Sequence, residues 1–137
     1  MPYKTGYMPL RDFFTPLNQS NLTPKKGFLN SQFGLKIDSY FSEFPDIVNV
    51  KYDLAIVGVL DDRNAVDNIG CAHGPDYVRE KLYRLNTGNY TSRIVDLGNI
   101  KAGHKVADTY VALKMVIADL IKRNICPVII GGGQDLT

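Results

Sequence analysis

The sequence predicts an α/β fold built around a parallel sheet. Three short apolar runs, rich in β-branched residues, alternate with two amphipathic stretches of helical period. Such runs are typical of strands buried on both faces, and the alternation of strand and helix favours right-handed crossovers within one sheet. We therefore expect parallel strands at 53–60, 93–97 and 127–131, with helices near 75–86 and 105–124.

The first strand ends at Asp61 and Asp62, and a loop then runs to Gly74. A connection of this length is often functional. The first helix is expected to begin with Pro75 and Asp76, because proline suits the first helical position and an acid there interacts favourably with the helix dipole. The inward face of this helix is expected to comprise Val78, Leu82 and Leu85.

The second helix carries a longer apolar stripe and ends in two cations. Lys122 and Arg123 lie in its expected last turn, where positive charge interacts favourably with the helix dipole. Pro127 then starts the third strand, which leads into the glycines at 131–133. The stripe itself consists of Val106, Tyr110, Leu113, Ile117, Leu120 and Ile121.

Residues 1–48 are interpreted as an amino-terminal extension with one or two short helices, and residues 49–137 as the first part of the main domain. The extension is rich in Asn, Ser, Pro and aromatic residues and shows weak periodicity. Its best helical stretch is 31–43, where aromatic residues recur at spacings of three or four. These aromatics favour a role in the core over a binding surface.

Composition excludes several classes of partner. With 45% hydrophobic and 22% charged residues and a net charge of +2, the chain matches neither a nucleic-acid-binding nor a membrane-binding protein. The amino terminus lacks the apolar core of a signal peptide, and no apolar run reaches membrane-spanning length. Cys71 and Cys126 are too few for a disulfide framework, so we expect reduced thiols and a cytoplasmic location. Cys126 is interpreted as an inert, packed thiol.

The common cofactor motifs are absent. No GxGxxG follows the first strand and no Walker A loop occurs, which disfavours nucleotide binding. His73 and His104 have no HxxxH or HxxE partner, and each is interpreted as a loop or helix-start residue. Asp61, Asp62 and Asp67 crowd one loop and could bind a hard cation, but such carboxylates more often cap turns.

The third strand opens onto a site-forming turn. In open α/β sheets, ligands bind just beyond such strand ends, and glycine is needed where the backbone takes a positive φ or a ligand approaches closely. Since a strand and a glycine loop of this kind rarely close a domain, we expect the sequence to be the front part of a larger protein.

Four segments carry a family resemblance: residues 53–59, 68–79, 95–100 and 127–132. In this order they resemble the amino-terminal half of the ureohydrolase superfamily, which comprises the arginases, agmatinases and formimidoylglutamases. The resemblance covers roughly residues 52–137 and is strongest to the formimidoylglutamase-like, arginase-family branch. It implies a three-layer α/β sandwich around an eight-stranded parallel sheet, of which only the amino-terminal part is present.

The resemblance also implies a chemistry. Enzymes of this family hold two Mn²⁺ ions that bridge a hydroxide, which attacks the carbon of a guanidino or formimino group. Paired cations lower the pKa of bound water and stabilise the tetrahedral oxygens. The first metal ligand is the His of a GGDHS segment, and the other ligands lie on later DxHxD and DxD segments. This sequence contains neither later segment.

The sequence departs from the family at the ligand position that it reaches. Where the family has Asp-His-Ser, this chain has Gly133-Gln134-Asp135. Gln134 occupies the position of the metal-binding His, but a neutral amide is a weaker ligand and hard cations need several oxygen ligands at once. We therefore expect a metal-free chain in which Gln134 projects into the cleft, either solvated or hydrogen-bonded to the glycine loop.

Three functional hypotheses remain. In the first hypothesis, the chain is the inactive amino-terminal fragment of a hydrolase of linear amidine or guanidino C–N bonds. In the second, it is a degenerate relative that binds a metabolite or partner without catalysis. The third is an unrelated Rossmann-like nucleotide-binding module, which the missing glycine fingerprint disfavours. For the fragment we also expect self-association as a homodimer, because a sheet cut after its third long strand exposes backbone edges and an apolar face.

Overall fold

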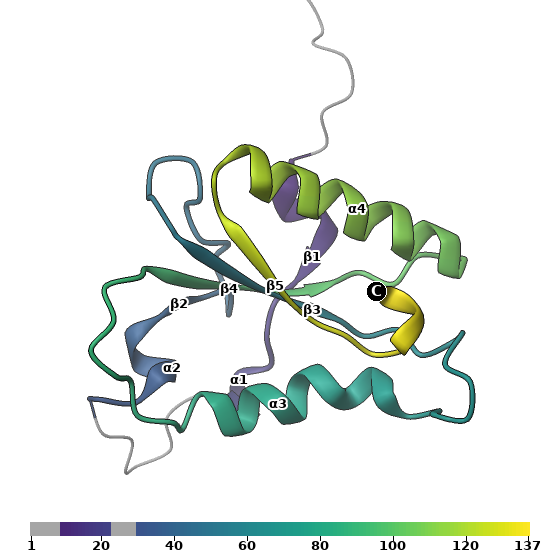
Figure 1. Ribbon diagram of the computed structural model, residues 1–137, viewed down its shortest axis with the longest axis horizontal. Helices are drawn as coiled ribbons and strands as arrows, with labels where there is room; N and C mark the ends of the chain where they lie inside the picture. The colour runs from purple at the N-terminus through teal and green to yellow at the C-terminus, as the bar shows by residue number, and fades with distance from the viewer. Residues whose placement is uncertain (1–8, 23–29) are drawn as a thin grey trace, which may run out of the picture.

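The computed structural model describes residues 9–22 and 30–137. Figure 1 shows a central sheet with helix α3 (Gly74–Leu82) on one face and helix α4 (Val106–Lys122) on the other. The three long strands are β3 (Leu54–Val59), β4 (Ile94–Ile100) and β5 (Cys126–Ile130). The α/β class and the mostly parallel sheet are therefore confirmed.

Strand β3 lies at the centre of the sheet. It pairs in parallel with β4 on one side, where Leu54 lies opposite Ile94, and with β5 on the other, where Leu54 lies opposite Cys126. The three parallel strands predicted from the sequence are thus confirmed. The helix predicted over 75–86 is shorter, since α3 ends at Leu82.

The amino-terminal segment also contributes to the sheet. Strand β1 (Phe14–Thr15), which follows a 3-10 turn at Leu10–Phe13, pairs antiparallel with the end of β4, and β2 (Asp38–Ser39) pairs in parallel with its start. A short helix, α1 (Gln19–Leu22), lies between them in the sequence. The sheet among the described residues therefore has five strands and one antiparallel pair.

The helix predicted over 31–43 is wrong. Only one turn forms, α2 (Phe33–Lys36), because Ile37 is extended (φ −103°, ψ 155°). Beyond it, the backbone amide of Tyr40 donates to the carbonyl of Asp96 on β4 at 2.9 Å. Hydrogen bonds to the open side of β4 thus replace the intrahelical ones, a tertiary contact that overrides the local apolar periodicity.

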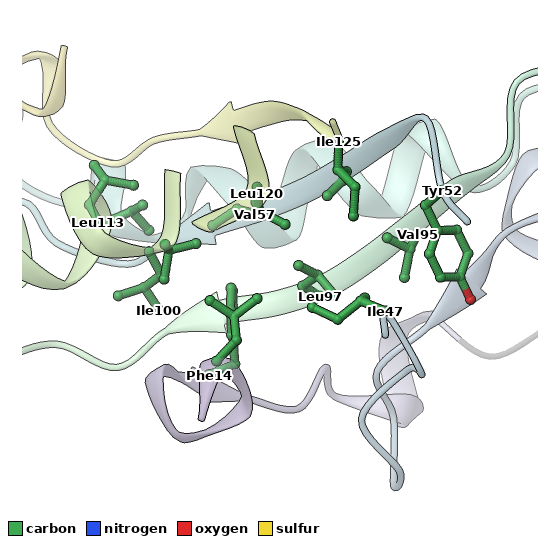
Figure 2. Close-up of a cluster of buried hydrophobic side chains, with 14 residues drawn as sticks. Phe14, Ile47, Tyr52, Val57, Val95, Leu97, Ile100, Leu113, Leu120 and Ile125 are labelled. Atoms are coloured by element: carbon green, nitrogen blue, oxygen red, sulfur yellow. The ribbon is translucent and has the colours of Figure 1, made fainter. Parts of the chain in front are cut away.

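The main core lies among β3, β4, α4 and the amino-terminal segment. Figure 2 shows Val57 of β3, Leu97 of β4 and Leu113 of α4 within this cluster. Side chains alternate along a strand, so these strands direct every second residue to this side. The buried cluster comprises Leu10, Phe14, Ile47, Tyr52, Ala55, Val57, Val59, Val95, Leu97, Ile100, Leu113, Val116, Leu120 and Ile125.

The predicted stripe of α4 is correct in its middle and wrong at its end. Leu113 and Leu120 are buried, but the side of the helix that carries Ile121 faces outward and leaves that residue 58% exposed. Thr109, Val116 and Asp119 complete the buried face. Of the described helices, none combines the length and the apolar character needed to cross a membrane.

The predicted inward face of α3 is wrong at two of its three positions, since only Leu82 is half-buried. Val78 and Leu85 are exposed, and the buried positions of the α3 segment are Pro75, Arg79 and Tyr83. The cause is a carboxylate on the opposing strand, because Asp96 alternates with Val95 and Leu97 and so faces α3 rather than the main core. An arginine that pairs with this carboxylate takes the inward position that apolar periodicity assigned to leucine and valine.

This buried pair is part of a closed polar network. Arg79 donates from Nε and Nη2 to the two carboxylate oxygens of Asp96, at 2.8 and 2.9 Å, and from Nη1 to Asn99 Oδ1 at 2.6 Å. The Tyr83 hydroxyl donates to Asp96 Oδ2 at 2.9 Å. Every buried donor and acceptor here has a partner, so the network fixes α3 against β4.

Candidate functional site at the strand ends

Three loops meet at the carboxyl ends of the parallel strands. The loop after β3 joins the glycine loop after β5, because the Gly133 amide donates to the carbonyl of Asp61 at 2.9 Å. The loop after β3 also contacts the loop after β4, because Nη1 of its residue Arg63 donates to the carbonyl of His104 at 3.1 Å. This is the edge at which open α/β sheets bind ligands.

Asp61 is committed to Arg63 and is not a free metal ligand. Its two carboxylate oxygens accept from Nε and Nη2 of Arg63, at 2.9 and 2.6 Å. The Asp61 side chain is 3% exposed, and hydrogen bonding by the guanidinium lowers its pKa to about 2. The pair ties the start of the loop to α4, since Arg63 Nη2 also contacts the hydroxyl of Thr109 at 3.2 Å.

The other loop carboxylates do not join Asp61 in a cation site. Asp62 Oδ2 accepts from the Gly70 amide at 2.7 Å and the Ala72 amide at 3.4 Å, so it closes the loop just before the short helix at 71–73. Asp67 is exposed and has a positive φ of 54°. Within residues 9–22 and 30–137, no three His, Cys, Asp or Glu side chains form a metal-binding group.

The glycine loop is required by close approach rather than by a positive φ. A Cβ at Gly132 would collide with the backbone of Asp61, whereas a Cβ at Gly133 would meet only the side-chain oxygen Oδ1 of Asp135, which can move away. Gly132 therefore lets the loop approach the backbone of Asp61 at the end of β3. The loop leads into the short 3-10 helix η3 (Gln134–Leu136).

A hollow of about 310 Å³ lies between this helix and the loop after β3. Gln134 is exposed and borders it, at the carboxyl end of β5 where the sequence places the family's metal-binding position. Its role as a ligand remains a prediction. The hollow is lined by Asn64, Ala65, Val66, Asn68, Gln134 and Asp135.

Tyr110 joins two sides of this hollow and was missed as a functional residue. Its hydroxyl donates to Asp135 Oδ2 and accepts a hydrogen bond from Asn64 Nδ2 at 3.0 Å. The hydrogen bond to the Asp135 carboxylate raises the pKa of the Tyr110 phenol. The helical stripe assigned Tyr110 to the core, and nothing in the sequence indicated that α4 lies beside the last loop.

The histidines and cysteines lie outside this cluster of side chains. His73 and His104 are exposed, and His104 contributes its backbone oxygen only. Both cysteines are free thiols. The prediction that Cys126 is a packed thiol is wrong, because Cys126 is exposed at the start of β5. Strand β5 pairs on one side only among the described residues, so the apolar neighbours that the sequence implied do not cover this thiol.

The described residues do not fit a two-manganese centre. Gln134 offers one neutral oxygen, Asp61 is held by Arg63, and Asp62 accepts from backbone amides. A pair of hard divalent cations needs several carboxylate or imidazole ligands at once. No reaction step through a metal is therefore derived from this set of side chains.

Comparison with known proteins identifies one relationship. The family model described as the Arginase family matches residues 52–137. No curated protein and no solved structure matches the chain. The matched region starts just before β3 and includes all three strand-end loops, so the hollow lies entirely within it.

Proposed function

Because the chain belongs to the arginase family, we propose that it forms the amino-terminal part of a hydrolase acting on linear amidine or guanidino C–N bonds. The supporting observation is the polar hollow at the ends of β3 and β5, which lies inside the family match and carries the carboxylate of Asp135. A carboxylate beside amide groups suits a small cationic nitrogen compound.

The formimidoylglutamase-like branch is the proposed place within the family. Its support is the run of three glycines before Gln134, in place of the more common GGDHS pattern. In this proposal the Mn²⁺ ligands come from DxHxD and DxD segments outside the 137 residues, and this chain contributes position 134 and the wall of the hollow.

Two activity measurements test the proposal. With Mn²⁺ added, the 137-residue chain is expected to release no product from guanidino or formimino compounds, because it lacks the later ligands. A product of the same gene that includes both later segments is expected to turn over one of these compounds. Turnover by the repurified chain alone, or none by the longer product, would contradict the proposal.

The ligand position has its own test in that longer product. Gln134→His restores an imidazole, so it is expected to strengthen Mn²⁺ binding if position 134 faces the metal. Calorimetric titration of both proteins with Mn²⁺ measures the difference. Equal affinities would show that position 134 is not a ligand site.

A second candidate function is binding without catalysis. It is favoured by Gln134, because an amide in place of the family's imidazole weakens a metal centre while leaving the hollow intact. A longer product that binds a guanidino compound in calorimetry, with no turnover at saturating Mn²⁺, would favour this function over hydrolysis.

We further propose that copies of the chain associate through the free edge of β5. Apart from Pro127, which has no amide hydrogen to donate, this strand carries none of the charged residues that usually protect a sheet edge, and Val128 is 42% exposed. Light scattering at micromolar concentrations is expected to give a homodimer. Val128→Lys is expected to give a monomer, while Val111→Lys on the exposed side of α4 serves as the matched control and leaves the dimer intact.

The remaining proposals concern organisation and location. We propose a boundary near residue 48 between an amino-terminal addition and the family domain, supported by the start of the family match at residue 52. A cytoplasmic location is supported by the two free thiols.

A further inference from the structure

We infer that a second hollow, at the opposite edge of the sheet, binds a small carboxylate that carries an aromatic or aliphatic body. This second hollow has a volume of about 260 Å³ and is lined by residues 9–11, 44–48 and 123. Arg123 follows the last residue of α4, just before β5 begins, so the second hollow lies near the amino ends of the parallel strands. Apart from Arg123, its lining residues lie outside the family match, so the inference is independent of the proposed hydrolysis.

An apolar wall provides the first half of the recognition. Leu10 is buried in the main core, whereas Phe44 and Pro45 are half-buried and keep part of their surface open to the second hollow. The Phe44 ring is held by two aromatic neighbours, since its centre lies 5.1 Å from that of Tyr40 and 5.7 Å from that of Phe14. A fixed wall of this kind favours an apolar ligand body, because binding buries apolar surface and orders few side chains.

Two arginines border the same wall and provide the second half. Arg123 is held in place because its Nε donates to Asp119 Oδ2 at 2.7 Å, while its side chain remains 31% exposed. The terminal nitrogens of this guanidinium therefore remain as donors for a ligand. Arg11 is exposed, and its side chain has no ion-pair partner within residues 9–22 and 30–137. Guanidinium groups bind carboxylates in a bidentate geometry, which favours a carboxylate as the charged end of the ligand.

The acid beside the arginines does not occupy them. The carboxylate of Asp46 closes its own turn, because Oδ1 accepts from the amides of Val48 and Asn49 at 3.1 and 2.9 Å. Its other oxygen, Oδ2, accepts from Asn49 Nδ2 at 2.9 Å. Two guanidinium groups beside one carboxylate with partners of its own leave an excess of positive charge on the wall. The second hollow therefore favours a monoanion over a cation or a neutral molecule.

Direct binding to the 137-residue chain provides the test. The ¹⁵N-labelled protein is titrated with 3-phenylpropionate at constant ionic strength, and the backbone amide shifts of residues 46–48 are followed. The comparison ligands are 3-phenylpropionamide, which keeps the ring without the charge, and propionate, which keeps the charge without the ring. We expect saturable shifts with 3-phenylpropionate and affinities about tenfold weaker, or less, for both others.

The comparison ligands also define the results that overturn the inference. Equal affinity for the amide would show that the wall takes any apolar molecule. Equal affinity for propionate would show an adventitious ion only. The absence of saturable shifts with 3-phenylpropionate would show that no carboxylate of this class binds.

Variants assign the binding to the second hollow. Arg11→Gln and Arg123→Gln each remove a charge-assisted hydrogen bond and are expected to weaken 3-phenylpropionate binding by about three- to tenfold. Val48 is 74% exposed, so Val48→Glu is expected to leave the fold intact and to weaken binding by about tenfold through like-charge repulsion. Lys101→Gln, which removes a positive charge just after β4, is the matched control and is expected to leave binding unchanged. Arg11→Gln and Val48→Glu proteins that keep the native amide spectrum and bind like the unmodified chain would refute the assignment.

The same spectra test whether a second copy of the chain is the occupant. Amide shifts of residues 46–48 that grow with protein concentration in the absence of ligand would show a copy seated in the second hollow and would overturn the inference. Spectra of these amides that are independent of protein concentration are expected. Since no turnover is measured, loss of this site would leave the hydrolase proposal standing, and an inactive longer product would leave this site standing.

Discussion

Two arginine–aspartate pairs have the same bidentate geometry in different surroundings. Arg79 and Asp96 are both 0% exposed between α3 and β4, whereas the Arg63 side chain is 38% exposed beside the buried Asp61 at the strand ends. The first pair joins a helix to the sheet, and the second holds a loop near the candidate site. The difference predicts that burial, rather than hydrogen-bond geometry, determines how much each arginine contributes to stability.

The physical reason is desolvation. A fully buried charge that loses its partner cannot be compensated by water, whereas a charge that solvent can reach is compensated in part. Asp96 would be left unpaired in an environment closed to solvent on every side. Asp61 is also buried, but the guanidinium that covers it is 38% exposed, so water can reach this carboxylate once the guanidinium is removed. The two pairs therefore predict unequal effects of the same substitution.

The largest effect is expected for Arg79→Met. This change leaves Asp96 without its cation and is expected to lower the free energy of unfolding by about 3–5 kcal/mol. Urea denaturation followed by circular dichroism measures the loss. Arg63→Met is the matched control, with an expected loss of at most about 1–2 kcal/mol. Equal losses would disprove the distinction between the two pairs.

A backbone change beside the buried pair is expected to rank second. Gly98 has a φ of +84°, and a Cβ there would collide with the carbonyl oxygen of Thr15. Gly98→Ala is therefore expected to cost about 1–3 kcal/mol in urea unfolding. Gly88→Ala, in open space and without a positive φ, is the control and is expected to change stability by less than about 0.5 kcal/mol.

The contribution of the Arg63–Asp61 pair at the strand ends is expected to appear as a pH dependence of the free energy of unfolding. Hydrogen bonding from Arg63 lowers the pKa of Asp61 from its usual 3.8 to about 2. Because the folded-state pKa is the lower one, the stabilisation is full above pH 4 and is lost as the pH falls through 2. Its size is about 1–2 kcal/mol once solvent screening of the exposed guanidinium is considered.

Asp61→Asn is expected to remove this dependence. Unfolding free energies measured between pH 5 and pH 2 should fall less steeply in the variant than in the unmodified chain. Asp53→Asn, a second carboxylate beside β3, controls for the general effect of removing a negative charge. Parallel curves for the unmodified chain and Asp61→Asn would contradict the proposed coupling.

The smallest effect is expected at the surface pair of Arg93 and Asp38. Both side chains are more than half exposed, their closest atoms are 3.6 Å apart, and the guanidinium carbon lies 5.3 Å from the ring centre of Tyr52. Arg93→Gln is expected to cost less than about 1 kcal/mol in the same urea assay. A loss as large as that of Arg79→Met would show that exposure is a poor guide here.

The sequence predicted the strands well because their signal is local. Apolar, β-branched runs bounded by glycine, proline or aspartate identify β3, β4 and β5 without knowledge of their neighbours. The faces of α3 were not predictable in this way. Arg79 faces inward because Asp96 of β4 faces it, and apolar periodicity contains no information about a polar pair between elements.

The candidate site shows the same limit. Its place at the strand ends followed from the glycine loop at 131–133, but its composition did not. Asn64, Tyr110 and Asp135 come from three separate elements and form one hydrogen-bonded chain only after the sheet has brought those elements together. The shortness of the helix at 33–36 also depends on a contact between distant elements, since the residues that follow it pair with β4 instead of continuing the helix.

The central position of β3 has a consequence for how the chain reaches this structure. Leu54 pairs with Ile94 across one helical crossover and with Cys126 across two. Such distant pairings must close large loops before they gain energy, which slows folding. During synthesis, β3 leaves the ribosome well before β5, so one of its hydrogen-bonding edges stays unpaired until the later strand emerges. The nascent chain is therefore most vulnerable to aggregation in that interval, when a chaperone that covers β3 would be most effective.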